Sequence, residues 1–331
     1  MTPWIKEILA SKTCTNIPVL THPGIEATGH KVIEAVKNGD IHYEAIKYLA
    51  DKYPTFACCT IMDLTVEAEA FGAEVEFNEN DLPNVLGRLV CDAESVEKLA
   101  VPSLEAARVP EYLKACRRAV ENIERPILAG CIGPFSLAGR LYDMSEIMVG
   151  IYLEPDVINA LLEKCTQFLI SYAGELKRLG AKGIFMAEPA AGLLSDDDCR
   201  AFSSVYVKRI VDALQDDSFA VILHNCGNTG QCTAAMVDST AAALHFGNAI
   251  DMKGVIDQCP ADVLVMGNVD PVSIMKQATP EKVKATTKAL LEAMDGHANY
   301  VLSTGCDVPP HCPTANIDAY FEALDEYNQS R

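Results

Sequence analysis

Short apolar runs alternate with longer segments of helical period along most of the chain. The apolar runs read as strands buried on both faces, and the segments between them carry apolar residues at helical spacing. Strands that alternate with helices in this way are typical of a parallel sheet with right-handed crossovers, so the pattern predicts an α/β protein. The predicted strands cover residues 55–61, 126–132, 183–187, 219–223, 242–246, 263–266 and 300–303.

Residues 1–53 precede the first of these strands and are mainly helical in pattern, with a strand and loop at 17–24. The chain has 331 residues, more than the roughly 250 typical of a (β/α)8 barrel, and no Ser/Gly run or charge block marks a linker. We therefore expect a single domain over residues 1–331, a (β/α)8 TIM barrel. Residues 1–53 are expected to be an N-terminal helical extension packed on the barrel.

Several predicted strands end in polar residues. The strand at 219–223 leads into His224 and Cys226, and the strand at 300–303 leads into Cys306. Alternation along an extended chain puts His224 and Cys226 on the same side. The carboxyl ends of barrel strands meet at one mouth, where active-site residues collect. The other polar residues at predicted strand ends are Asp63, Glu188, Asn248, Asn268 and Asp270.

His224, Cys226 and Cys306 form a soft ligand set that suits zinc. Three protein ligands leave one coordination position open, as in catalytic zinc sites. The alternative is that these thiols are simply buried, because free cysteines often are and the chain has 13 of them. Position at the strand ends favours the zinc site. Cys312 is a rival ligand close to Cys306.

Each remaining strand-end residue also has a structural interpretation. Asp63 is suited to capping the helix that follows it, and Glu188 precedes a proline, which restricts its backbone. Asn248, Asn268 and Asp270 follow glycine-containing turns and suit hydrogen bonding within a loop. His245 lies inside a strand and is expected to be a packed, hydrogen-bonded core residue.

Charge and composition exclude some partners. The net charge of −19 argues against nucleic acid, whose binding depends on Lys and Arg contacts to phosphate. No apolar run approaches the ~20 residues of a membrane span, and the N-terminus lacks a signal-peptide pattern, so no membrane partner and a cytoplasmic location are expected. The odd number of scattered cysteines fits reduced thiols.

Four motifs stand out in the sequence: 62–73 (MDLTVEAEAFGA), 224–227 (HNCG), 267–271 (GNVDP) and 305–310 (GCDVPP). Together they resemble the uroporphyrinogen decarboxylase superfamily, in its corrinoid-dependent methyltransferase branch. The similarity covers nearly the whole chain and is strongest to the methylcobalamin:coenzyme M methyltransferases. Two departures separate the chain from true decarboxylases: no arginine occurs in residues 19–26, and Cys306 stands where those enzymes carry a histidine.

The resemblance implies a barrel with Zn²⁺ bound at its mouth by His224, Cys226 and Cys306. It implies a small thiol such as coenzyme M as methyl acceptor and a methylated corrinoid, carried by a separate small corrinoid protein, as donor. With this chemistry in mind, we expect Glu188 to fill the open metal position in the resting enzyme and Asp63 to orient a ligand or the acceptor. Asn268 and Asp270 are expected to contribute to cofactor binding in the same supporting way. Arg140 and Lys182 are candidates for gripping an anionic tail of the acceptor.

Two other functions stay open. A methyltransferase of this kind can also serve the other half-reaction, demethylating a methoxylated or methylamine-type substrate onto the corrinoid protein, with zinc as Lewis acid on the leaving atom. The third possibility is a uroporphyrinogen decarboxylase-like protein without decarboxylase activity, whose zinc is structural.

Overall fold

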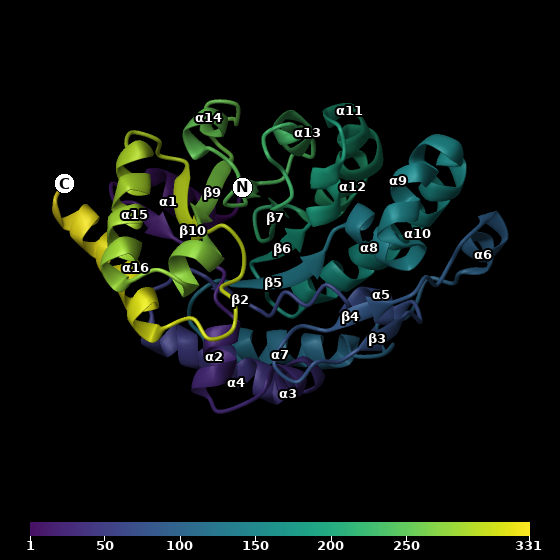
Figure 1. Ribbon diagram of the computed structural model, residues 1–331, viewed down its shortest axis with the longest axis horizontal. Coiled ribbons are helices and arrows are strands. Elements are labelled where there is room, and N and C mark those ends of the chain that lie inside the picture. The colour runs from purple at the N-terminus through teal and green to yellow at the C-terminus, as the bar shows by residue number, and fades with distance from the viewer.

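A parallel sheet of eight strands curls around the centre of the computed structural model, which describes residues 1–331 (Figure 1). Its edge strands meet where the Phe56 N–H donates to the Asn16 carbonyl at 3.1 Å, and the Asn16 side chain donates to the Pro54 carbonyl at 3.2 Å. The predicted (β/α)8 barrel is confirmed. In spatial order the strands are β1 (Thr15–Asn16), β10 (Tyr300–Thr304), β9 (Leu264–Val269), β8 (Ala243–Phe246), β7 (Ala220–Asn225), β6 (Gly183–Ala187), β5 (Ile127–Ile132) and β2 (Cys58–Cys59).

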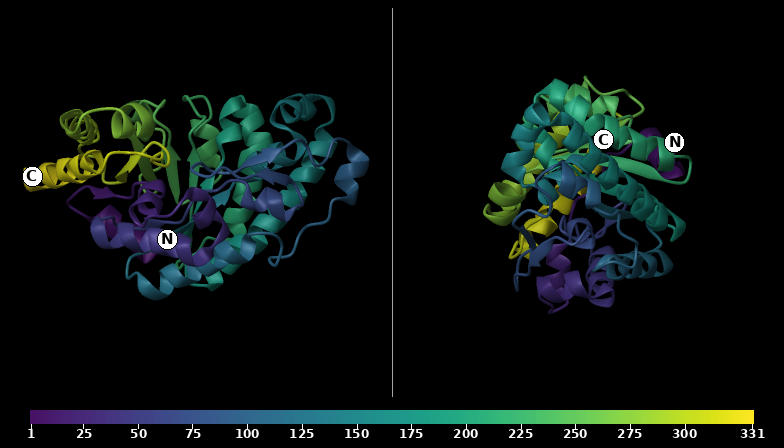
Figure 2. Two further views of the ribbon diagram at one scale, coloured as in Figure 1. Left: turned by 60° about the horizontal axis from the view of Figure 1, so that its bottom comes forward. Right: turned by 90° about the vertical axis from the view of Figure 1, so that its right-hand side faces the viewer.

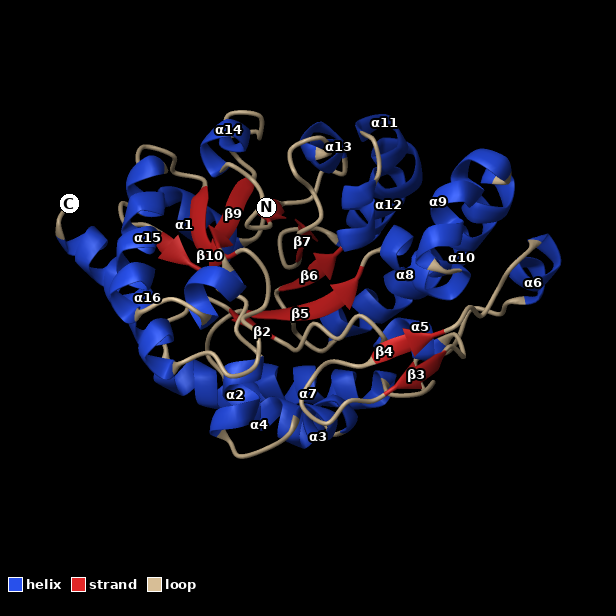
Figure 3. Ribbon diagram, in the orientation of Figure 1, coloured by secondary structure: helices blue, strands red, loops and turns tan.

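Helices follow the strands of this eight-stranded sheet and cover its outside (Figure 3). In the left-hand view of Figure 2, the C-terminal helix α16, in yellow, lies at one end of the molecule. No helix combines the length and the apolar composition that a membrane crossing requires. The helices are α1 (Pro3–Ala10), α2 (His22–Ala27), α3 (Val32–Lys37), α4 (Gly39–Lys52), α5 (Val66–Ala70), α6 (Ala93–Lys98), α7 (Val109–Asn122), α8 (Pro134–Tyr142), α9 (Met144–Leu153), α10 (Pro155–Arg178), α11 (Asp196–Cys199), α12 (Val205–Leu214), α13 (Thr233–Asp238), α14 (Met252–Ile256), α15 (Pro280–Ala293) and α16 (Thr314–Gln329).

Shorter elements lie in the connections. Between β2 and β5 the chain adds an antiparallel hairpin of β3 (Glu74–Glu76) and β4 (Asn84–Leu86). Single turns of 3-10 helix at Pro189–Leu193 (η1) and of π-helix at Arg200–Ser204 (η2) lie between β6 and α12, and a second π turn, Pro271–Lys276 (η3), follows β9.

The first barrel strand differs from the sequence expectation. All seven strands predicted from Thr55 onward are present, but the eighth, β1, comes from the segment assigned to the extension. The barrel therefore begins at Thr15, and α2, α3 and α4 form the crossover from β1 to β2. A paired segment of two residues, followed closely by Pro18, is too short to give a clear strand pattern among helical segments.

Helix α1 packs on the amino ends of the strands. Its apolar face, Trp4, Ile5 and Ile8, joins the cluster of side chains that fills the barrel interior. The Trp4 indole donates to the carbonyl of Lys182, the residue before β6. Burying a side chain of this size contributes roughly 1.5–3 kcal/mol. One end of the barrel is thereby covered, and Lys182 lies at that end, away from the carboxyl ends of the strands where an acceptor was expected.

Candidate metal centre at the carboxyl ends of the strands

His224, Cys226 and Cys306 lie together at the carboxyl ends of β7 and β10. One ligand atom from each, a ring nitrogen and two sulfurs, lies within 4.8 Å of the others. Ala220 and Ile222 point into the barrel, and His224, two residues further along β7, continues on the same side. Cys226 and Cys306 stand on the turns that follow the two strands. The structure thus brings together the three residues predicted as metal ligands.

Two glycines allow these turns to approach closely. A Cβ added at Gly247, after β8, would lie 2.7 Å from the Cα of Cys226. A Cβ added at Gly305 would lie 2.6 Å from the backbone nitrogen of Asn248. The turns after β7, β8 and β10 therefore pack backbone against backbone, which carries Cys306 towards Cys226.

A buried hydrogen-bonded chain stands behind His224. Its Nδ1 lies 2.7 Å from Nδ1 of His245, whose Nε2 lies 2.8 Å from Oγ of Ser303. The Ser303 hydroxyl in turn lies 2.7 Å from the carbonyl oxygen of Ile17. His224 and His245 are directly paired residues of β7 and β8. The side chains of His224, His245 and Ser303 are all buried.

The direction of this chain fixes the tautomer of His224. A carbonyl oxygen only accepts, so Ser303 donates to Ile17 and accepts from His245 Nε2–H. Burial lowers the pKa of His245 well below its ordinary value, and the neighbouring His224 lowers it further, so His245 is neutral. Its Nδ1 then accepts from His224 Nδ1–H. The lone pair of His224 is left on Nε2.

That nitrogen has no partner in the protein. His224 Nε2 is buried and makes no hydrogen bond, which costs about 1–3 kcal/mol unless a ligand satisfies it. Beside it, hydrogen bonding between the two thiols lowers the pKa of Cys226 and raises that of Cys306. A free imidazole lone pair and two sulfurs are the donor set that zinc prefers, so these residues fit a zinc ion. In metal sites the ring N–H of a histidine that does not face the metal is usually bound by a carboxylate or a carbonyl, which orients the ring. Here the Nδ1–H of His224 is bound by His245, which is held in turn by Ser303.

A cavity of about 220 Å³ opens beside the cluster. Apolar walls come from Met62, Leu64 and Ala187, and the charged side chains at its edge are Arg140 and Asp307. A larger hollow of about 560 Å³ lies at the amino end of the barrel, between the loop after α1 and the end of α16. It holds no comparable set of metal-binding atoms, so the smaller cavity is the candidate active site.

Asp63 lies outside this cavity in a saturated network. Its carboxylate accepts from the backbone and hydroxyl of Thr65, from the Arg108 guanidinium and from the Tyr112 hydroxyl. Arg108 also pairs with Glu69. Asp63 is therefore engaged in fastening α5 to α7, and no part of its carboxylate is left to orient a ligand or an acceptor.

The backbone N–H of Glu188 donates to the His224 carbonyl at 2.8 Å, but its carboxylate is not part of the metal cluster. Its buried carboxylate accepts from the backbone N–H groups of Phe135 and Ser136, at 2.7 and 2.8 Å, and from the Ser203 hydroxyl at 3.0 Å. Burial raises its pKa, while these hydrogen bonds favour the charged form. The carboxylate thus caps the N-terminus of α8, a place where negative charge is stabilised, and is not available as the fourth zinc ligand.

The two residues expected on the cofactor side serve the loops. Asn268 donates to the carbonyls of Gly247 and Ile250, at 2.9 and 2.7 Å. Asp270 accepts from two backbone N–H groups at the start of η3, both at 2.8 Å. Neither residue lines the cavity, and both hold the turns after β8 and β9 in place.

Residues 13–327 match the family described as Uroporphyrinogen decarboxylase (URO-D). The chain belongs to the uroporphyrinogen decarboxylase family. It is 31% identical to Methylcobamide:CoM methyltransferase MtbA of Methanosarcina mazei over 270 residues, covering 80% of this chain and 78% of the relative. It is 25% identical to the Uroporphyrinogen decarboxylase of Photorhabdus laumondii, covering 93% and 91%.

One solved structure has nearly the same fold as this protein. The "methyltransferase from Methanosarcina mazei" superposes with a TM-score of 0.89 at 24% identity, over 98% of both chains. Together with the sequence relatives, this confirms the predicted placement in the methyltransferase branch of the uroporphyrinogen decarboxylase family. The chain is accordingly an enzyme of the methyltransferase type.

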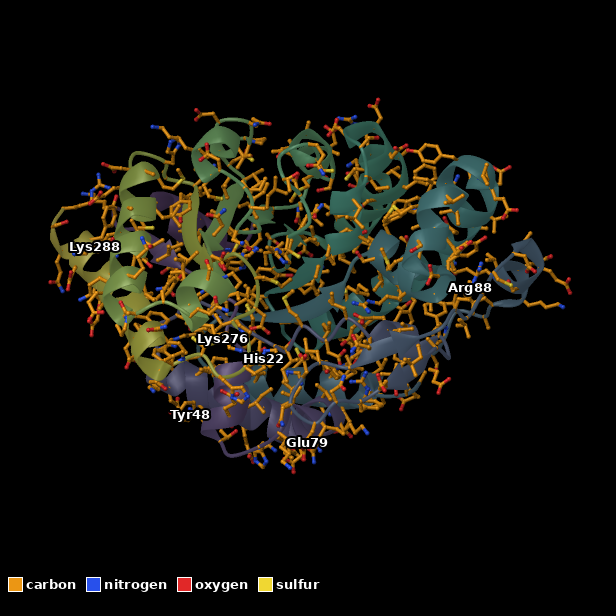
Figure 4. All side chains as sticks on the ribbon, in the orientation of Figure 1. His22, Tyr48, Glu79, Arg88, Lys276 and Lys288 are labelled. Atoms are coloured by element: carbon orange, nitrogen blue, oxygen red, sulfur yellow. The ribbon has the colours of Figure 1, made fainter.

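His245 is the packed, hydrogen-bonded core residue that the sequence predicted, but its hydrogen bonds to the metal-ligand candidate His224 and to Ser303 were not predicted. The places of His245 and Ser303 were recoverable from strand alternation, since Ala243 and Val301, two residues earlier in β8 and β10, face the barrel interior. His22, which Figure 4 labels, is also buried, with its Nδ1 3.4 Å from a carboxylate oxygen of Asp307. Cys312 bonds through sulfur to the Met275 carbonyl and stays outside the cluster.

Proposed function

We propose that this protein is a zinc-dependent methyltransferase that moves a methyl group from a methylated corrinoid to a thiol such as coenzyme M. The observation that carries the proposal is the cluster of three metal-binding atoms, the unpaired His224 Nε2 and the sulfurs of Cys226 and Cys306, beside a cavity at the barrel mouth. Relatives named methylcobamide:CoM methyltransferases support the choice of donor and acceptor. The donor would be held by a separate small corrinoid protein.

The chemistry requires a sulfur nucleophile at neutral pH. A free thiol has a pKa near 8.5, so only a minority is thiolate. Zinc held by His224, Cys226 and Cys306 would supply the missing activation, because a thiol bound to zinc is deprotonated. His245 and Ser303 hold the His224 ring with Nε2 towards the other ligands. Met62, Leu64 and Ala187 limit the water beside the reacting sulfur.

Zinc content and zinc-edge X-ray absorption, with and without added thiols, test this function. We expect one zinc per chain with two sulfur neighbours, and a third sulfur when the acceptor thiol is added. Cys306→Ser should lose the metal. Cys312→Ser is the matched control: it removes a neighbouring buried thiol outside the cluster and should keep the metal.

Two results would refute the proposal. Metal-free protein that transfers methyl groups to a thiol at full rate would remove the zinc. A bound zinc that never gains a sulfur, in a protein that methylates reduced corrinoid protein from a methoxylated compound, would place the chain in the opposite half-reaction.

A further inference from the structure

Arg140 is a half-buried arginine on the wall of the cavity that holds the metal cluster. Its guanidinium makes no hydrogen bond and no ion pair within the protein, whereas Arg108, a buried arginine of this region, binds Asp63, Glu69 and Thr65. A guanidinium carries five donors and no acceptor, and the protein provides the Arg140 guanidinium with no group to bind.

The carboxylates around Arg140 are committed elsewhere. Asp63 is saturated, and one oxygen of Glu67 accepts from the Ile132 N–H, so both contribute only at longer range to the charge on Arg140. Asp307, the other charged group on the cavity wall, accepts from the backbone and the hydroxyl of Thr21. Arg140 is therefore a cation that is free to bind a negative group inside the cavity.

The position of Arg140 is fixed by the protein. It lies in the last turn of α8, whose first turn is held by the Glu188 carboxylate through Phe135 and Ser136. Ser136 also accepts from the Ala190 N–H at 3.1 Å, which ties the same turn to the segment after β6. The guanidinium is thus presented from a rigid element, which suits a residue that selects a ligand.

We infer that Arg140 is the specificity-determining residue for the acceptor and binds the anionic tail, a sulfonate or a carboxylate, of a short thiol whose sulfur lies at the metal cluster. The planar guanidinium matches the paired oxygens of such groups. A volume of about 220 Å³ is below the range of pockets for drug-sized ligands, so it suits a short carbon spacer and not a tetrapyrrole. Binding of the thiol sulfur at the metal cluster rests on the proposed function, whereas binding of the negative group by Arg140 does not.

The test compares wild type with Arg140→Gln, Arg140→Lys and a control, Arg88→Gln. Arg88 donates to the Val90 carbonyl, and its guanidinium lies over the ring of Tyr142, which is in α8 with Arg140. Arg88 does not line the cavity. With free methylcobalamin as donor, KM and kcat are measured for 2-mercaptoethanesulfonate, 3-mercaptopropionate and neutral 2-mercaptoethanol. Calorimetry measures the binding of ethanesulfonate, which has no thiol, to the zinc-loaded protein.

We expect Arg140→Gln to raise KM for the preferred anionic thiol about 10- to 100-fold with little change in kcat, and to leave 2-mercaptoethanol unaffected. Arg140→Lys should recover part of the loss, and Arg88→Gln should behave as wild type. The anionic thiol with the lower wild-type KM identifies the tail as sulfonate or carboxylate. Equal changes for charged and neutral thiols, or no change, would overturn the assignment.

Ethanesulfonate binding separates this inference from the proposed function. If wild type methylates no thiol, the proposed function fails, yet ethanesulfonate binding that disappears in Arg140→Gln still supports the anion site. If wild type does not bind ethanesulfonate, and carboxylate thiols bind no better than 2-mercaptoethanol, the anion site is refuted whatever the activity.

Discussion

Replacing Ser303 with alanine tests the hydrogen-bonded chain behind His224. The substitution removes two short bonds, at 2.8 Å from His245 and 2.7 Å to Ile17. It leaves a buried N–H and a buried carbonyl without partners, and two such groups together cost about 2–4 kcal/mol of unfolding free energy. Without its acceptor, His245 is no longer confined to one tautomer, and His224 loses the arrangement that keeps its lone pair on Nε2. We expect zinc affinity to fall about 10- to 100-fold, the usual effect of removing such a support.

The assay is competition for zinc against a chromophoric chelator, paired with chemical denaturation of the metal-free protein. Thr304→Val is the control, because it also removes a buried hydroxyl from β10, one that accepts from the Val19 N–H at 3.1 Å, but it leaves the chain behind His224 intact. Ser303→Ala should lower both stability and zinc affinity, and Thr304→Val stability alone. Wild-type zinc affinity in Ser303→Ala, or an equal loss of affinity in Thr304→Val, would refute the tautomer argument.

Two further substitutions test the buried carboxylates. Glu188→Gln leaves an N–H at the start of α8 without a charged acceptor and should lower the unfolding free energy by about 1.5–3 kcal/mol. Elemental analysis should find the zinc content unchanged. Loss of zinc at wild-type stability would instead make Glu188 a metal ligand. Burial raises the pKa of Glu67 from 4.5 to about 7, so the folded protein holds a proton that the unfolded chain releases, and wild-type stability should fall as pH rises between these values. At roughly 1.36 kcal/mol per pKa unit, the loss of unfolding free energy is about 3 kcal/mol. Glu67→Gln should remove this pH dependence. Denaturation curves at pH 5 and pH 8 that differ as much in Glu67→Gln as in wild type would contradict this.

The arrangement of strands could be predicted because the barrel strands are buried on both faces. Runs such as 183–187 and 127–132 have few polar residues, so they stand out against the helices around them. A strand was expected at 17–24, outside the barrel, whereas β1 lies just before it and pairs through only two residues, Thr15 and Asn16. Its place in the barrel is set by neighbours far along the chain, in β10 and at Phe56, which no local pattern records.

The metal cluster could be predicted for a different reason. His224 and Cys226 are two residues apart at the end of a strand, and barrel topology alone puts the end of β10 at the same mouth. The role of Glu188 could not be predicted, because its partners Phe135 and Ser136 begin a helix more than 50 residues earlier. They meet only because β5 and β6 are adjacent strands, so the carboxylate after one reaches the helix after the other.

What separates structural from functional residues at this barrel mouth is whether the protein itself supplies their partners. Asp63, Asn268 and Asp270 were all predicted from their position after strands, and in each case neighbouring segments of the protein bind the side chain. His224 Nε2 is buried without a partner, the half-buried Arg140 guanidinium makes no hydrogen bond or ion pair, and both residues line one cavity. Thr287 and Tyr320, whose buried hydroxyls are also unpaired, do not line that cavity. Since buried polar groups are normally satisfied, a metal ligand and a cation left open to the same small space indicate a ligand with a soft donor at one end and a negative charge at the other.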